Sequence, residues 1–239
     1  MNALNFYYAR QAEARGLDSL DKLQKLAPDV DRVYDAIVLP RLPQNRAVVI
    51  YELACGPGLF LAWLGRRGYH NVTGTDFCEN YVRIAQAANL PVQKRDSILD
   101  IKSKPDRSVD VICAIDFIEH LPKDVFVEFL FETQRVLKVG GTLLMRAPNP
   151  DGLLLGRNLN NDITHFWAYT SDSLGAMAKV LGFRDSEFVD ESISPAKGKW
   201  RLLWPLSVMA RGLLYATLAL ATRERVRMLG PSYFAFITK

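Results

Sequence analysis

The chain has 239 residues, enough for one sizeable hydrophobic core and short for two. A composition of 49% hydrophobic and 23% charged residues excludes a disordered chain and a disulfide-rich secreted scaffold. The formal net charge of +4 is uneven, because residues 197–239 hold eight Lys and Arg against one acid and leave the rest at −3.

The cysteines and the first residues of the chain bear on where the protein works. Cys55, Cys78 and Cys113 are scattered singly, which argues against a zinc cluster and fits a reducing compartment. Residues 1–16 lack a basic stretch followed by an apolar run, so no signal peptide is expected. The expected location is the cytoplasm, with peripheral membrane contact left open.

Hydrophobic patterning predicts alternating helices and strands. Residues 3–38 have a helical pattern, with breaks near Gly16 and Pro28 and a stop at Pro40. Beyond them, short apolar runs alternate with helical periodicity, which indicates βαβ units and a parallel sheet. The predicted strands cover 47–52, 71–75, 91–94, 109–115, 142–146, 183–189 and 232–238. The predicted helices cover 58–67, 79–88, 123–137 and 171–181, with a turn at Gly140-Gly141.

The segment between the last two predicted strands spans about forty residues where a hairpin loop would suffice. Its stretch 199–228 is apolar and helical, but Arg201 and Arg211 argue against a membrane span. Packing of this helix on the sheet or in a dimer interface is favoured, since most apolar helices belong to a core. The alternative is a helix lying on a membrane surface, which Trp200, Trp204 and the flanking arginines fit.

The first chemical motif, ELACGPG at 52–58, follows the predicted strand 47–52. Its glycines, Gly56 and Gly58, let the backbone turn tightly and approach a ligand, and the next helix offers free N–H groups. A dinucleotide site would have a third glycine where Leu61 stands. The acid Glu52 suits the α-amino group of an amino-acid ligand better than a pyrophosphate.

Two further carboxylates end the next two strands. Asp76, in GTDF (74–77), is placed to accept hydrogen bonds from both hydroxyls of an adenosine ribose. Asp96, in RDSI (95–98), can accept a hydrogen bond from the adenine amino group. Each acid alone could be a helix cap, but the ordered set predicts a ligand with an amino group, a ribose and an adenine.

With DVICAIDFIEHL (110–121) and RVLKVGGTLL (135–144), the sequence resembles the class I S-adenosylmethionine-dependent methyltransferase superfamily over residues 48–188. It departs at Ala54, where the family more often has glycine, and this implies tighter packing on the ligand. The resemblance implies S-adenosylmethionine as cofactor. The residues that it implies as cofactor contacts are Glu52, Ala54, Cys55, Gly56, Gly58, Asp76, Phe77, Asp96, Ser97, Ile98, Ile115 and Asp116.

The expected fold is a single α/β domain, a doubly wound Rossmann-like seven-stranded sheet with its last strand antiparallel. Residues 41–191 are expected to form the cofactor-binding core and 231–239 the last strand. An N-terminal helical lid covers 1–40, in which Phe6, Tyr7 and Tyr8 are implied to close on the cofactor. A helical insertion covers 192–230.

The segment 116–120 lies where open α/β sheets bind ligands. His120, Glu119 and His165 are the candidate catalytic residues, with His120 as general base. Together with Asp116 they could hold a divalent cation such as Mg²⁺ or Mn²⁺, which would lower the pKa of an acceptor hydroxyl. This pattern resembles metal-assisted O-methyltransferases of ubiquinone biosynthesis and of small-RNA 3′-end methylation. A metal-free site is favoured, because Glu-His at this position is common in family members without metal.

The predicted reaction is methyl transfer to a hydroxyl, first of all a sugar hydroxyl of a glycan or glycosylated metabolite. Asp162-x-x-His165 and the apolar basic helix resemble methyltransferases of surface-glycan and secondary-metabolite clusters. The alternatives are a quinone or lipid O-methyltransferase at the membrane surface, an RNA 2′-O-methyltransferase and a non-catalytic binding protein. A nucleic-acid partner is not expected, because a sheet face with interleaved aromatics is missing. A homodimer is left open.

Overall fold

The computed structural model describes residues 7–8, 10–11, 14, 16–17, 19–153, 155–194, 198, 202–224 and 226–239. The expectations for Phe6, Trp200 and Arg201 lie outside the described residues.

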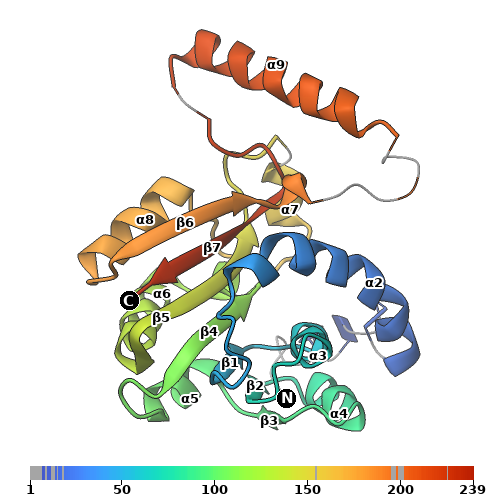
Figure 1. Cartoon of the computed structure of the whole chain (residues 1–239), viewed down its shortest axis with the longest axis vertical. Helices are drawn as coiled ribbons and strands as arrows, with labels where there is room; N and C mark the ends of the chain where they lie inside the picture. The colour runs from blue at the N-terminus through green and yellow to red at the C-terminus, as the bar shows by residue number, and fades with distance from the viewer. Residues whose placement is uncertain are drawn as a thin grey trace.

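In the described part of the chain, seven strands form one sheet in the order β3-β2-β1-β4-β5-β7-β6 (Figure 1). β1 to β5 run parallel, and β7 pairs antiparallel with both β5 and β6. This confirms the predicted doubly wound fold with its antiparallel last strand. The strands are β1 (Ile50–Leu53), β2 (Val72–Asp76), β3 (Val92–Lys94), β4 (Val109–Ile115), β5 (Leu137–Pro148), β6 (Asp185–Asp190) and β7 (Ser232–Thr238).

Helices cover both faces of the sheet. Neighbouring residues of a strand point to opposite faces, so Ile112 of β4 joins one hydrophobic cluster and Val111 the other. The first cluster packs against α5, α6 and α8, and the second against α2, α3 and α4. The helices are α2 (Leu20–Ile37), α3 (Leu59–Arg66), α4 (Glu79–Ala87), α5 (Ser97–Ser103), α6 (Lys123–Val136), α7 (Leu155–Asn160), α8 (Ser171–Val180) and α9 (Trp204–Thr222).

Two local predictions are wrong. α2 runs through Pro28 without a break, because the residues that it buries, among them Tyr34 and Ile37, outweigh the one hydrogen bond that a proline removes. Gly140-Gly141 is part of β5 and not a turn. The register between β4 and β5 shifts between Val109 and Val111, and Gly140 absorbs the irregularity with a φ of +77°. The short helices α5 and α7 were not predicted.

The favoured packing of the late helix on the sheet is also wrong. No residue of α9 is buried, and the helix stands apart from the sheet (Figure 1). The physical reason is that other helices already cover both faces of the sheet, so no apolar sheet surface remains for α9.

The carboxyl ends of β1, β2, β4 and β5 meet at one edge of the sheet, which we call the carboxyl edge. The end of β6 and the start of β7 reach the same edge, because Pro148 pairs with Ser232 and Asp190 pairs with Tyr233. The insertion that carries α9 therefore leaves the domain on the side where the candidate site lies.

Candidate active site

The turn after β1 has a strained backbone that packs closely on β2. Ala54, Gly56 and Gly58 have φ angles of +50°, +55° and +85°, and for Ala54 this region is unfavourable because of its Cβ. The Ala54 N–H donates to the Ser97 hydroxyl at 3.0 Å, which holds it in place. A side chain on Gly74 would come within 2.9 Å of the Cys55 Sγ atom. The predicted loop residues thus form a tight turn.

Glu52 lies at the end of β1 and is only 2% exposed. Its Oε2 atom has no hydrogen-bond partner among the described residues. Burial, and then the charge of Asp76, raises the pKa of Glu52 well above its ordinary value. A buried carboxylate without a cation is costly, so this position fits the ammonium group of an amino-acid ligand.

Asp76 ends β2 and binds the same loop. Its Oδ2 atom accepts the Gly56 N–H and its Oδ1 atom the Cys78 N–H, both at 2.8 Å. Burial raises the pKa of Asp76 to about 6. Each carboxylate oxygen can accept a further hydrogen bond, so the pair fits two adjacent ribose hydroxyls. The neighbouring Phe77 ring is 40% exposed and available for packing on a base.

Asp96 caps helix α5. Its Oδ1 atom accepts the N–H groups of Ile98 and Leu99, both at 2.9 Å. The cap fixes the first turn of α5, which also carries Ser97, the partner of Ala54. Of the remaining predicted contacts, Ile115 is half-buried at the end of β4. The structure therefore brings the predicted cofactor residues to neighbouring strand ends.

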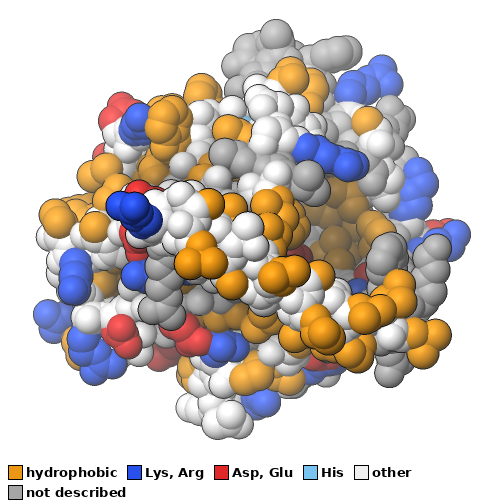
Figure 2. Space-filling model, turned by 90° about the horizontal axis from the view of Figure 1, so that it is seen from above, with side chains coloured by type: hydrophobic (Ala, Val, Ile, Leu, Met, Phe, Trp, Pro, Cys, Tyr) orange, Lys and Arg blue, Asp and Glu red, His pale blue; other side chains and the backbone are white. Residues whose placement is uncertain are grey.

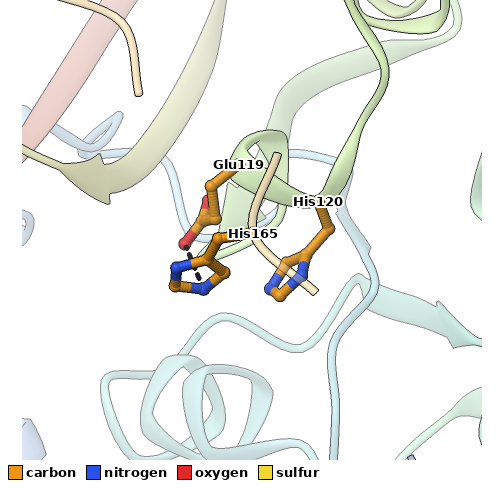
Figure 3. Close-up of side chains that lie close together, drawn as sticks. All are labelled: Glu119, His120 and His165. Carbon is orange, nitrogen blue, oxygen red and sulfur yellow. Dashed lines mark ion pairs between the residues drawn. The ribbon is translucent and has the colours of Figure 1, made fainter. Parts of the chain in front are cut away.

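Glu119, His120 and His165 lie together at the carboxyl edge (Figure 3). The first two belong to the short helix η2 (Ile118–His120), and His165 follows α7. Their candidate ligand atoms all lie within 4.8 Å of one another. The Glu119 Oε1 atom is 4.0 Å from the His165 Nε2 atom, while Glu119 Oε2 lacks a hydrogen-bond partner among the described residues. Burial, and then Asp116, raises the pKa of Glu119 well above its ordinary value.

The hydrogen bonds around His120 fix which ring nitrogen carries the proton. Thr164 donates its hydroxyl to the Asp162 carboxylate at 2.6 Å and lies 2.9 Å from the His120 Nδ1 atom. A hydroxyl has one hydrogen, so Thr164 accepts from the His120 Nδ1–H and leaves a lone pair on Nε2. Burial, and then His165, lowers the pKa of His120 to about 4, so the ring is neutral near pH 7.

The N-terminal segment contacts both His120 and the residues that are predicted to bind the cofactor. The Tyr8 hydroxyl is 3.4 Å from the His120 Nδ1 atom, and its ring meets Phe77 edge-on at 4.9 Å between centroids. Gln11 donates to the buried Asp162 carboxylate at 2.5 Å. Sequence reasoning did not find Thr164 or Gln11. The motif Asp162-x-x-His165 was visible, but nothing in it shows that Asp162 acts through Thr164.

Asp116 lies outside the cluster, although it was predicted as a fourth metal ligand. Both of its carboxylate oxygens accept from Arg146 Nη1, and the Arg146 Nη2 atom lies 2.7 Å from Glu191. The physical reason is the strand register, which pairs Ile115 with Arg146 and sets the arginine beside the next residue. The signal that sequence reasoning missed was this arginine near the end of an otherwise apolar strand. The structure therefore brings together three of the four predicted ligands.

The chain is similar to known methyltransferases. Residues 51–145 match the family model of a methyltransferase domain. A probable S-adenosylmethionine-dependent methyltransferase of Mycolicibacterium smegmatis is 31% identical over 56% of this chain and 51% of its own length. One of Mycobacterium tuberculosis is 26% identical over 68% of this chain and 60% of its own length. The chain thus spans about half to three fifths of these relatives.

Solved structures show the same fold. A methyltransferase from Archaeoglobus fulgidus that depends on S-adenosylmethionine superposes with a TM-score of 0.67 at 23% identity and covers 89% of this chain and 94% of its own. DhpI in complex with S-adenosylhomocysteine superposes with a TM-score of 0.58 at 14% identity and covers 98% of this chain and 93% of its own.

Proposed function

We propose that this chain is a class I S-adenosylmethionine-dependent methyltransferase and that it transfers a methyl group from S-adenosylmethionine to an acceptor hydroxyl; the methyltransferase family match, the relatives and the shared fold support this. Our first choice of acceptor is a sugar hydroxyl of a glycan or glycosylated metabolite. The observation that carries the choice of a hydroxyl is His120, a neutral imidazole held with its Nε2 lone pair free at the carboxyl edge.

S-Adenosylmethionine supplies a methyl group on a sulfonium, which is electrophilic without activation by the protein. Glu52, buried and without a cation, would bind its ammonium group, and Asp76 would bind the ribose hydroxyls. Phe77, Asp96 and the start of α5 would frame the adenine. These contacts hold the cofactor at the strand ends, so binding energy goes into alignment with the acceptor.

The acceptor hydroxyl loses its proton as the new C–O bond forms and the S–CH₃ bond breaks. His120 Nε2 would take this proton, so the imidazole gains the positive charge that the sulfonium loses. Thr164 and Asp162 would stabilise the imidazolium, because its Nδ1–H already points to the Thr164 hydroxyl and through it to a carboxylate. The products are the methyl ether, S-adenosylhomocysteine and a proton on His120.

The alternative is a cation held by Glu119, His120 and His165. Both imidazoles form their hydrogen bonds through Nδ1, His165 with the Leu159 carbonyl at 3.0 Å and His120 with Thr164. This observation favours a cation, because it leaves both Nε2 atoms available as ligands. A cation there would lower the pKa of the hydroxyl directly. The two arrangements differ in their response to chelation.

The test is an acceptor screen with S-adenosylmethionine labelled in its methyl group. Saccharides and glycosylated metabolites, quinols, short RNAs and primary amines are compared, each with and without EDTA. We expect labelled methyl ethers on a saccharide, with equal rates in EDTA. Labelled quinol or RNA would select one of the alternative acceptors, and loss of transfer in EDTA would select the cation. Transfer to amines alone would contradict methylation of a hydroxyl.

A further inference from the structure

Helix α9 presents an apolar surface to the outside. Arg211 is the single charged residue within its 19 residues. Four large apolar side chains on the helix are strongly exposed, with exposed fractions of 61% for Leu206, 71% for Met209, 72% for Leu213 and 83% for Leu220. Such a helix is long and apolar enough to cross a membrane.

The larger polar side chains of α9 lie on its half-buried side, whereas Thr217 and Thr222 are exposed. The half-buried residues recur at helical spacing and form the stripe nearest the rest of the protein: Trp204, Ser207, Arg211, Leu214, Tyr215 and Leu218. Arg211 Nη1 donates to the Ser192 carbonyl at 2.7 Å and to the Ser192 hydroxyl at 2.8 Å. The Tyr215 hydroxyl donates to the Arg227 carbonyl at 3.3 Å. This arrangement is the reverse of a water-exposed helix, whose polar side faces out.

The connections of α9 favour a helix that lies in the plane of a membrane over one that crosses it. β6 ends at Asp190 and β7 begins at Ser232, so the chain leaves the sheet before α9 and rejoins it after α9 at the same carboxyl edge. A crossing helix would set its two ends about 28 Å apart on opposite sides of a bilayer. The contacts of Arg211 and Tyr215 also keep one side of the helix against protein, where lipid cannot surround it.

The charge around α9 favours an anionic membrane over a second copy of the chain. Seven Lys and Arg against one acid lie in 197–227, where Arg223 follows the helix directly and Arg227 pairs with Asp172 at 3.2 Å. Figure 2 looks down on this side of the molecule, and hydrophobic side chains gather across its middle with Lys and Arg toward its edges. Two copies joined through α9 would bring two such basic segments together, whereas acidic headgroups would neutralise them.

We propose that α9 docks the protein on an anionic phospholipid membrane. Leu206, Met209, Leu213 and Leu220 enter the boundary between headgroups and acyl chains, and the flanking arginines bind the headgroups. Because the insertion leaves the domain at the carboxyl edge, docking brings the candidate active site close to the membrane surface. This inference does not depend on the proposed methyl transfer.

The test is co-sedimentation of the full chain with vesicles of phosphatidylcholine alone and of phosphatidylcholine with phosphatidylglycerol at 7:3. We expect binding to the mixed vesicles that weakens with added salt, and much weaker binding to phosphatidylcholine alone. The double variant Leu213→Gln and Leu220→Gln should weaken binding about a hundredfold, since each leucine is worth about tenfold when buried in lipid. The control Val139→Gln changes a side chain that is 77% exposed on β5 and should bind like wild type.

A second measurement places a tryptophan on the outward side of α9. Brominated acyl chains should quench the fluorescence of the variant Met209→Trp in mixed vesicles more than that of the wild type, because Met209 is 71% exposed whereas Trp204 lies on the half-buried side. Failure of the wild type to bind the mixed vesicles, or equal binding by the double variant, would overturn the proposal. A wild-type dimer that the double variant dissociates, with vesicles unbound by either, would assign the surface to a second copy instead.

Discussion

The two halves of the carboxyl edge, one predicted to bind the cofactor and one that holds His120, use their buried carboxylates differently, although each half also contains one with an oxygen unpartnered in the described part of the chain, Glu52 or Glu119. On the cofactor half, Glu52 and Asp76 are buried carboxylates with raised pKa values and no cation beside them among the described residues. On the acceptor half, Asp162 receives hydrogen bonds from Thr164 and Gln11. The first half is complete only with a cationic ligand, whereas the second uses a satisfied carboxylate to set one histidine tautomer. If cofactor binding and chemistry divide in this way, a substitution in one half should leave the task of the other half unchanged.

The largest expected effect comes from His120→Gln on the acceptor half. Loss of the general base should lower kcat about 10² to 10⁴-fold, while the Kd for S-adenosylmethionine stays unchanged. Single-turnover methyl transfer to an acceptor found in the screen measures the rate of the chemical step, and calorimetry measures the Kd for S-adenosylmethionine. His70→Gln is the matched control, because His70 is exposed before β2. An equal loss of cofactor affinity in His120→Gln would break the division between the halves.

The pH dependence of stability tests the cofactor half. The pKa of Asp76 is raised to about 6 from an ordinary value of 3.8, so its protonated form favours the ligand-free fold. This contribution is full below about pH 4 and is lost as the pH rises through 6. Urea unfolding of wild type and Asp76→Asn should therefore show a difference that shifts by about 3 kcal/mol between pH 4 and 7.5, in favour of the variant at high pH. A difference in stability that does not change with pH would contradict a raised pKa for Asp76 in the folded protein.

Thr164→Val tests whether the tautomer of His120 is preset. The valine keeps the shape of the side chain but cannot accept the His120 Nδ1–H, so we expect a loss of about tenfold in kcat. The Kd for the cofactor should stay constant. Thr164→Ser keeps the hydroxyl and should restore the rate. Equal rates for the valine and serine variants would show that the hydrogen bond between His120 and Thr164 does not contribute to the rate.

The smallest effect is expected at Asp96, which has a structural task beside its predicted cofactor contact. Asp96→Ala removes the N-cap of α5 and should lower the free energy of unfolding by about 1 kcal/mol in urea. Thr170→Ala removes the cap of α8 and is the matched control. Both variants should lose stability, but only Asp96→Ala should also weaken cofactor binding. Unchanged binding in Asp96→Ala would reduce Asp96 to a cap.

The cofactor half could be predicted from the sequence because its residues are local. Asp76 ends β2 and Glu52 is the last residue but one of β1, and parallel strands bring their carboxyl ends together without further information. The acceptor half could not be assembled in this way, since His120, Thr164 and Tyr8 meet only through tertiary packing. The same limit applied to Asp116, whose pairing with Arg146 depends on the register of β4 and β5.

The fold followed from alternating apolar runs, but three features depended on competition between forces. Pro28 was tolerated in α2 because packing outweighed a lost hydrogen bond, and Gly140 shaped a strand irregularity where glycine usually indicates a turn. α9 is apolar in sequence, but the sequence could not show that its apolar side points away from the sheet, because this depends on other helices covering both faces of the sheet. Sequence periodicity shows which side of a helix is apolar, not what that side meets.

Calorimetric titration of S-adenosylmethionine into wild type and Asp76→Ala tests the central claim most directly. We expect one binding site per chain in the wild type and a loss of about a hundredfold in affinity in the variant, because two ribose hydroxyls lose their acceptor. Absence of binding to the wild type would contradict the methyltransferase function. Equal binding by both proteins would contradict the place assigned to the cofactor.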